Sequence, residues 1–158
     1  MKRTKLNKKS KRPTAVNRRI CDYMWGTVIV LRDRFCKYCN KNPVLVGHHI
    51  FAKGECPATR YDTKIGIGLC GGCHEFKAHA NPEKYRHINI KHVGGQKIYD
   101  NLFIMASLKC SPHDYAFVEI MLWQELGIYD VVKPEGWLDW SENKKQEWLR
   151  TKRKESRE

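Results

Sequence analysis

Four of the seven cysteines stand in two pairs with the same spacing, Cys36-x-x-Cys39 and Cys70-x-x-Cys73. A Cys-x-x-Cys knuckle can place two thiolates about one metal ion, and two knuckles together complete a tetrahedral four-sulfur zinc site. The alternative is two unrelated pairs of buried thiols, but both pairs share one spacing and both lie beside glycine or polar turn residues. We therefore predict a structural zinc bound by Cys36, Cys39, Cys70 and Cys73.

The other three cysteines, Cys21, Cys56 and Cys110, have no partner at ligand spacing and are expected to be ordinary thiols. An odd number of cysteines and the lack of an apolar secretory signal in the first twenty residues argue against a disulfide framework. Zinc binding of this kind contributes on the order of 10 to 16 kcal/mol of apparent free energy at neutral pH. The centre is therefore expected to be unfolded without metal.

Thirty residues separate Cys39 from Cys70, more than a simple zinc ribbon or finger needs. Residues 43–50 have the composition of a short strand that ends in two adjacent histidines, His48 and His49. Residues 65–69 predict a second short strand, and a helix should start near Gly71 and stop before Asn81-Pro82. The segment is therefore predicted to be a ββα unit.

These motifs resemble a known family. Cys-x-x-Cys, His48-His49-Ile50 and Leu69-Cys70-x-x-Cys73-His74 are similar to the zinc-containing HNH (His-Me finger) endonucleases. The stretch Ala-Thr-Arg-Tyr-Asp at 58–62 is closest to phage proteins of the NinG or Rap recombination type, with a more distant likeness to phage endonuclease VII, a resolvase of branched DNA. The likeness covers roughly residues 30 to 110, about half of the chain.

The resemblance implies a role for each histidine. In HNH nucleases the first residue of the pair holds a divalent metal and the second deprotonates the attacking water, so His48 would be the ligand and His49 the general base. A histidine suits the second role because an ordinary imidazole is mostly neutral at neutral pH. His74 matches the closing metal ligand of the family. His79 ranks below it as a ligand, since side chains at i and i+5 lie ~140° apart on an ideal α-helix.

The catalytic metal is expected to be manganese, nickel or magnesium. Magnesium prefers oxygen ligands, whereas imidazole suits manganese, nickel, cobalt or zinc. A site with His48 where the family often has aspartate should therefore depend less on magnesium. We expect manganese or nickel to support activity at least as well.

One position departs from the family pattern. Five residues before the second knuckle the family has an asparagine that orients the base, and this chain has Ile65. Either His49 is oriented by Asp62 or by a backbone carbonyl, or the site is impaired and only binding is retained. Asp62 could equally cap a loop. Arg60 and Lys53, inside the same loop, are candidates for contact with the scissile phosphate, with solvated surface charge as the alternative.

The net charge of +13 is uneven along the chain. Residues 1–19 form a basic arm with nine Lys or Arg and no acid, residues 20–140 are nearly neutral, and residues 141–158 predict a charged helix or tail. Basic residues that neutralise phosphates release condensed counterions, so DNA is the expected partner. A solubilising tail or a localisation signal would suit the arm as well. No stretch is long and apolar enough to span a membrane, and a cytoplasmic protein is expected.

The elements that must position these residues are mostly helices. Val16, Ile20, Met24, Val28 and Leu31 recur at helical spacing before the first knuckle. Further helices are expected after Asn81-Pro82, over the apolar residues from Ile98 to Ala106, from Ser111-Pro112-His113-Asp114 to Gly127, and from Ser141. Trp137, Trp140 and Trp148 lie near this last helix and could stack on exposed bases, but pinning the helix to the core is the favoured interpretation.

The sequence thus predicts an α+β fold, with a ββα-metal centre and a four-cysteine zinc site surrounded by helices. The resemblance implies a metal-dependent DNA endonuclease, phage-encoded and acting on branched or recombination-intermediate DNA, for which a homodimer is an option. A phage nickase for packaging or homing is one alternative. A non-catalytic, zinc-stabilised nucleic-acid-binding protein is the other, and Ile65 is the feature that motivates it.

Overall fold

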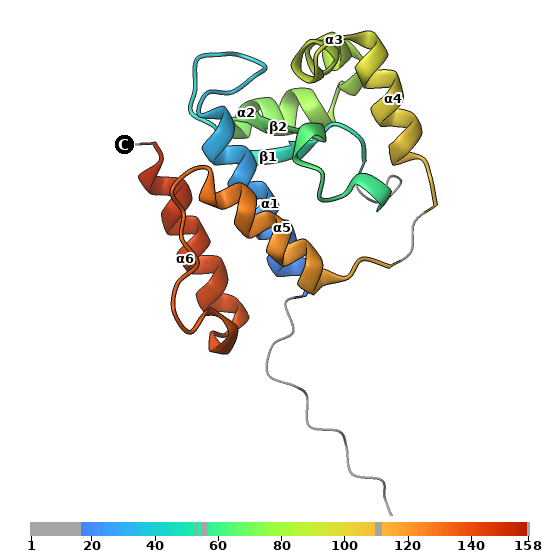
Figure 1. Ribbon diagram of the computed structural model, residues 1–158. Helices are drawn as coiled ribbons and strands as arrows, with labels where there is room; N and C mark the ends of the chain where they lie inside the picture. The colour runs from blue at the N-terminus through green and yellow to red at the C-terminus, as the bar shows by residue number, and fades with distance from the viewer. Residues whose placement is uncertain (1–16, 53, 55–56, 110–111, 158) are drawn as a thin grey trace, which may run out of the picture.

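The computed structural model describes residues 17–52, 54, 57–109 and 112–157 (Figure 1). The fold of this part is α+β, with one two-stranded antiparallel sheet and helices on both sides of it. The basic arm lies outside the described residues, apart from its last positions, as do Cys56, Cys110 and the candidate phosphate contact Lys53. No helix in the described ranges is long and apolar enough to cross a membrane.

Helix α1 (Arg18–Asp33) is the central element of the molecule. It begins where the side chain of Asn17 accepts a hydrogen bond from the amide of Ile20, which satisfies one unpaired donor of the first turn. The predicted apolar stripe is buried, with Ile20, Met24 and Val28 at most 2% exposed. One side of α1 packs against α5 (Tyr115–Gly127) and α6 (Glu142–Glu155), and another against the sheet.

Helices α5 and α6 start at capping residues that the sequence indicates. The carboxylate of Asp114 accepts from the amides at the start of α5, and the hydroxyl of Ser141 accepts from the amide of Lys144 at the start of α6. The three C-terminal tryptophans pack on the core formed by α1, α5 and α6, which confirms the favoured interpretation. Trp137, in the short turn η4 (Trp137–Asp139), is buried and donates to Glu119 of α5.

The sheet consists of β1 (Val46–His49) and β2 (Gly66–Leu69). The register pairs His48 with Ile67 and His49 with Gly66, so that successive residues alternate between the two faces. The face toward α1 carries glycines, because an added Cβ at Gly66 would lie 2.7 Å from the Trp25 ring. The absence of side chains here lets α1 approach the backbone of the sheet closely. The only large side chain on this face of the two strands is that of His49.

The chain continues from β2 into α2 (Gly71–Cys73) and directly into η3 (His74–His79), which is a π-helical segment. The predicted order of strand, strand and helix is therefore present. After Asn81 the chain forms α3 (Pro82–Val93) and α4 (Gln96–Ala106). The break between these helices falls at Gly94 and Gly95, which have φ angles of 102° and 118° that L side chains rarely adopt. Residues of α2, η3 and α3 cover the face of the sheet opposite α1, while α4 packs on Phe51 and Ile65 beside the strands.

Candidate metal centres and active-site cleft

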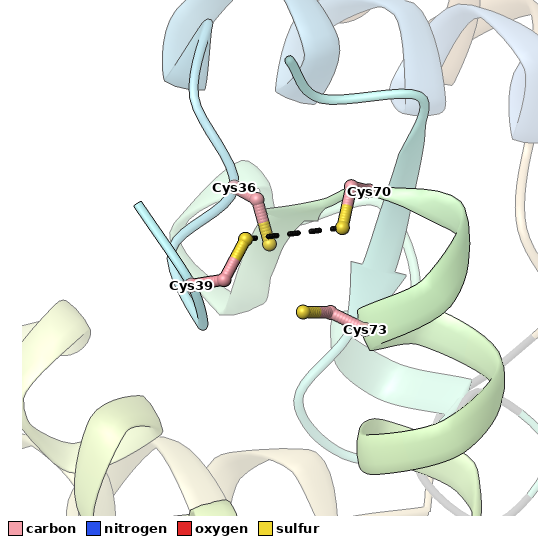
Figure 2. Close-up of side chains that lie close together, drawn as sticks. All are labelled: Cys36, Cys39, Cys70 and Cys73. Atoms are coloured by element: carbon pink, nitrogen blue, oxygen red, sulfur yellow. Dashed lines mark hydrogen bonds between the residues drawn. The ribbon is translucent and has the colours of Figure 1, made fainter. Parts of the chain in front are cut away.

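The four predicted zinc ligands lie together (Figure 2). Cys36 and Cys39 follow the end of α1, and Cys70 and Cys73 lie at the start of α2 and inside it. Their sulfur atoms are all within 4.8 Å of one another, and those of Cys39 and Cys70 are 4.0 Å apart. A tetrahedral zinc site with Zn–S bonds of about 2.3 Å has S–S edges of roughly 3.8 Å. The geometry therefore fits the predicted structural zinc.

The surroundings of the thiols also suit a metal. Backbone amides at Lys41 and Asn42 lower the pKa of Cys39 to about 6, whereas burial raises the pKa of Cys73 to about 12. The buried Cys73 thiol becomes a thiolate only when a cation compensates its charge. Zinc binding must therefore release protons, and zinc affinity should fall as the pH is lowered. Cys21, in contrast, is buried in α1, away from this cluster, as an ordinary thiol.

Three histidines form a second cluster at the edge of the sheet. His48 comes from β1, while His74 and His79 come from η3, and one ring nitrogen of each lies within 4.8 Å of the others. The Nε2 atoms of His74 and His79 are 3.1 Å apart. Their rings meet the ring of His48 edge-on, with centroids 5.3 and 5.1 Å away. The three imidazoles thus face a common point.

The lower rank given to His79 is corrected by the local geometry. An i, i+5 pair diverges on an α-helix, but η3 is π-helical, and an i→i+5 hydrogen-bond pattern brings residues five apart onto one face. His79 therefore lies beside His74 and completes the cluster with His48. Such π-helical turns are common at functional sites.

This cluster meets the chemical requirements of a transition-metal site. Burial and then the charges of His74 and His79 lower the pKa of His48 to about 3, so its imidazole is neutral at neutral pH and has a lone pair to donate. The Nδ1 atom of His74 lies 3.2 Å from a carboxylate oxygen of Glu75. A carboxylate on the outer nitrogen fixes the tautomer of a ligating histidine. The all-nitrogen donor set favours manganese, nickel, cobalt or zinc over magnesium.

His49 is held on the opposite face of β1. Its ring stacks on the indole of Trp25 from α1, with centroids 3.7 Å apart and planes 13° from parallel. Its Nε2 atom lies 2.9 Å from the backbone carbonyl oxygen of Arg60. A carbonyl can only accept a hydrogen bond, so Nε2 carries a proton. The ring is thereby held by a stacking contact on one side and a hydrogen bond at Nε2.

A cleft of about 440 Å³ brings the two kinds of histidine together. It is lined by His48 and His79 of the histidine cluster, by His49, and by Ala78 and Pro82 at the end of the π-helical segment. His49 and two members of the histidine cluster therefore border one cavity.

The structure gives Arg60 a role other than the predicted phosphate contact, and it gives Asp62 the loop-capping role that was the alternative to orienting His49. The Arg60 side chain is 6% exposed, and its Nε and Nη2 atoms donate to the carboxylate of Asp22 at 2.9 and 2.6 Å. We therefore correct the predicted phosphate contact, because burial and this ion pair hold the guanidinium inside the fold. The carboxylate of Asp62 caps the short turn η2 (Thr63–Ile65) by accepting from the amide of Lys64. Of the two predicted ways to orient His49, the structure has the backbone carbonyl.

Ile65 occupies a core position. It is 1% exposed and packs with Phe51, Tyr99 and Leu102 under α4, while its backbone carbonyl accepts from the amide of Ile50. A polar side chain here would be buried without an evident partner, which costs free energy. At the position where the resembling family has asparagine, this chain therefore has a packed core residue. The contact that orients His49 comes from the Arg60 carbonyl instead.

Sequence reasoning missed Asp22 and Trp25. Both lie on α1, three residues apart, and contact the loop of residues 60–62 beside the apolar stripe that was recognised. A charged residue and a tryptophan at helical spacing were the available signal, but their partners are about forty residues away in the sequence.

Comparison of the chain with protein-family models, with curated proteins and with solved structures finds no match. The functional interpretation therefore rests on the residues and geometry described above.

Proposed function

We propose that this protein is a metal-dependent DNA endonuclease of the zinc-stabilised HNH (His-Me finger) type. The observation that supports it most strongly is the cleft lined by His48, His49 and His79, which borders the cluster of His48, His74 and His79 that could hold a metal ion. A structural zinc on the four cysteines would tie the end of α1 to the start of α2. The histidine cluster and His49 lie on opposite faces of one small sheet, and the four cysteines lie at its end.

The residues of the cleft would divide the reaction between them. His49 Nδ1 takes a proton from a water molecule as the water oxygen attacks phosphorus, and the P–O3′ bond breaks to leave a 5′ phosphate. The departing 3′ oxygen takes a proton from solvent water to become a 3′ hydroxyl, and His49 returns its proton to solvent. Trp25 and the Arg60 carbonyl keep the ring from turning away during this transfer. His48, His74 and His79 would hold a divalent metal, which when bound would supply positive charge for the negative charge that develops on the phosphate oxygens.

DNA is the proposed substrate because the chain carries a net charge of +13, much of it in segments outside the central fold. Branched or recombination-intermediate DNA is preferred on the resemblance to phage recombination nucleases. The alternative of a non-catalytic nucleic-acid-binding module was motivated by Ile65. The hydrogen bond from His49 to the Arg60 carbonyl weakens this alternative, because it can orient the ring as the missing asparagine would.

A cleavage and binding assay on one set of substrates tests this proposal. Zinc-loaded protein is incubated with end-labelled four-way-junction, nicked and linear duplex DNA, with manganese, nickel or magnesium added or with no added metal. We expect metal-dependent cleavage, strongest on the junction and at least as fast with manganese or nickel as with magnesium.

The substrate pattern separates the alternatives. Paired, symmetric cuts in the junction would support a resolvase that acts as a dimer. Cuts confined to particular duplex sequences would favour a packaging or homing nickase. Retention of every DNA without cleavage under any metal would overturn the enzyme proposal in favour of the binding module.

A further inference from the structure

The loop that carries Arg60 is attached to one edge of α1 at successive helical turns. The hydroxyl of Tyr61 lies 3.4 Å from the carbonyl oxygen of Arg18, and the Trp25 indole donates to the carbonyl of Asp62 at 3.2 Å. Farther along, the Arg32 guanidinium donates to the carbonyl of Thr63 at 2.7 Å. This edge of α1 therefore acts as a template that sets the path of the loop.

Asp22 makes the strongest of these attachments. Its carboxylate receives two charge-assisted hydrogen bonds from Arg60, at 2.9 and 2.6 Å. A two-point pair of this kind fixes orientation as well as distance. The guanidinium is almost fully buried while Asp22 is about a quarter exposed, so loss of the carboxylate would leave a buried charge without this partner.

The same residue is also held through its backbone. The amide of Arg60 donates to the carbonyl of Pro57, within the turn η1 (Pro57–Thr59), at 3.2 Å. Arg60 is held on both sides as well as through its own amide and side chain, since the amide of Asp62 donates to the carbonyl of Thr59 at 2.9 Å. Its carbonyl oxygen then lies where it accepts from Nε2 of His49.

We propose that Asp22 is a positioning residue for His49: by holding the Arg60 side chain, it keeps the Arg60 carbonyl on Nε2 and so fixes the orientation of the imidazole ring and the proton on that nitrogen. Asp22 touches neither DNA nor metal in this role. The catalytic consequence rests on the proposed nuclease function, but the positioning of the imidazole does not. The Asp22–Arg60 ion pair thus takes the place of the asparagine that the resembling family has at the position of Ile65.

The variant Asp22→Asn tests this positioning role, because it keeps the size of the side chain and removes its charge. We expect kcat for DNA cleavage to fall about 10- to 100-fold, the usual cost of a misplaced catalytic group, while KM and manganese affinity stay unchanged. The conservative variant Asp22→Glu should recover much of the loss. Side-chain ¹⁵N NMR of His49 should show one tautomer, protonated on Nε2, in wild type and a mixture of tautomers in Asp22→Asn.

A second carboxylate that forms an ion pair with an arginine supplies a matched control. Glu142 of α6 pairs with Arg19 at 3.1 Å and accepts from the side chain of Asn17 at 2.7 Å, so among the described contacts its carboxylate binds the start of α1 and its own helix rather than the loop. Glu142→Gln should change neither kcat nor the His49 resonances. Melting temperatures of all variants identify any that are simply unfolded, and Arg60→Lys, which keeps the charge but loses the two-point geometry, gives an independent route to the same readouts.

The NMR result decides the inference separately from activity. An unchanged single tautomer in Asp22→Asn and in Arg60→Lys would overturn it, and so would a loss of kcat equal to that of Glu142→Gln. If wild-type protein cleaves no DNA, the proposed nuclease function fails, and the tautomer of His49 in Asp22→Asn still shows whether the ion pair positions the ring.

Discussion

Replacement of His49 by alanine should slow single-turnover DNA cleavage by about 10²- to 10⁴-fold, the range expected when a general base is removed. The structure motivates this because His49 lines the cleft beside the histidine cluster and its Nε2 is engaged by the Arg60 carbonyl. The histidine cluster is left intact, so metal affinity should not change. Cleavage of labelled DNA at saturating manganese measures the effect.

The control must separate chemistry from packing, because His49 also stacks on Trp25. His49→Gln retains an amide donor for the Arg60 carbonyl but cannot act as a base, and it should be as inactive as the alanine variant. His87→Ala removes an exposed imidazole that contacts only its own helix through the Lys84 carbonyl among the described contacts, and it should cleave at the wild-type rate. A His49→Gln protein with near wild-type activity would contradict the assignment of the base.

Loss of one zinc ligand should have the largest effect on stability. In Cys73→Ser we expect zinc content to fall well below that of wild type and the cooperative melting transition to be lost or strongly lowered. Structural zinc contributes on the order of 10 to 16 kcal/mol of apparent free energy, which is comparable with the whole stability of a domain, about 5 to 15 kcal/mol. The sheet and η3 should be affected most, since Cys70 and Cys73 lead directly into that segment.

Cys21→Ala is the matched control for this change. Cys21 is fully buried, as Cys73 nearly is, but it lies in the core of α1 with its sulfur 3.7 Å from the carbonyl oxygen of Tyr115. The variant should keep its full zinc content and lose only the moderate stability expected of a truncated core side chain. Elemental analysis and thermal melting of both variants provide the comparison. Wild-type zinc content in Cys73→Ser would contradict the four-cysteine site.

Local signals in the sequence predicted much of the fold. The two Cys-x-x-Cys knuckles correctly indicated a joint cluster, because their spacing constrains which thiols can meet. Helix starts at Asn81-Pro82, Asp114 and Ser141 were found from capping chemistry that acts within one turn. The apolar stripe of α1 likewise follows from its periodicity.

The rest of the site depends on tertiary structure. The π-helical form of η3 is not visible in residue spacing, so His79 appeared to diverge from His74. The role of Arg60 was misjudged because its partner Asp22 lies 38 residues earlier, and sequence alone gives no sign that a charge in a loop will be buried. The importance of Trp25 for His49 has the same cause, since their contact depends on how α1 docks on the glycine face of the sheet.

The most direct test of the proposed nuclease is a manganese titration of zinc-loaded wild type and His48→Ala, with bound metal and junction cleavage measured in the same samples. The signal of free manganese in electron paramagnetic resonance reports the bound fraction. We predict that wild type binds manganese at the His48, His74 and His79 cluster and that cleavage rises with occupancy, whereas His48→Ala does neither. Equal cleavage by both proteins, or full occupancy in wild type without cleavage, would contradict the proposal.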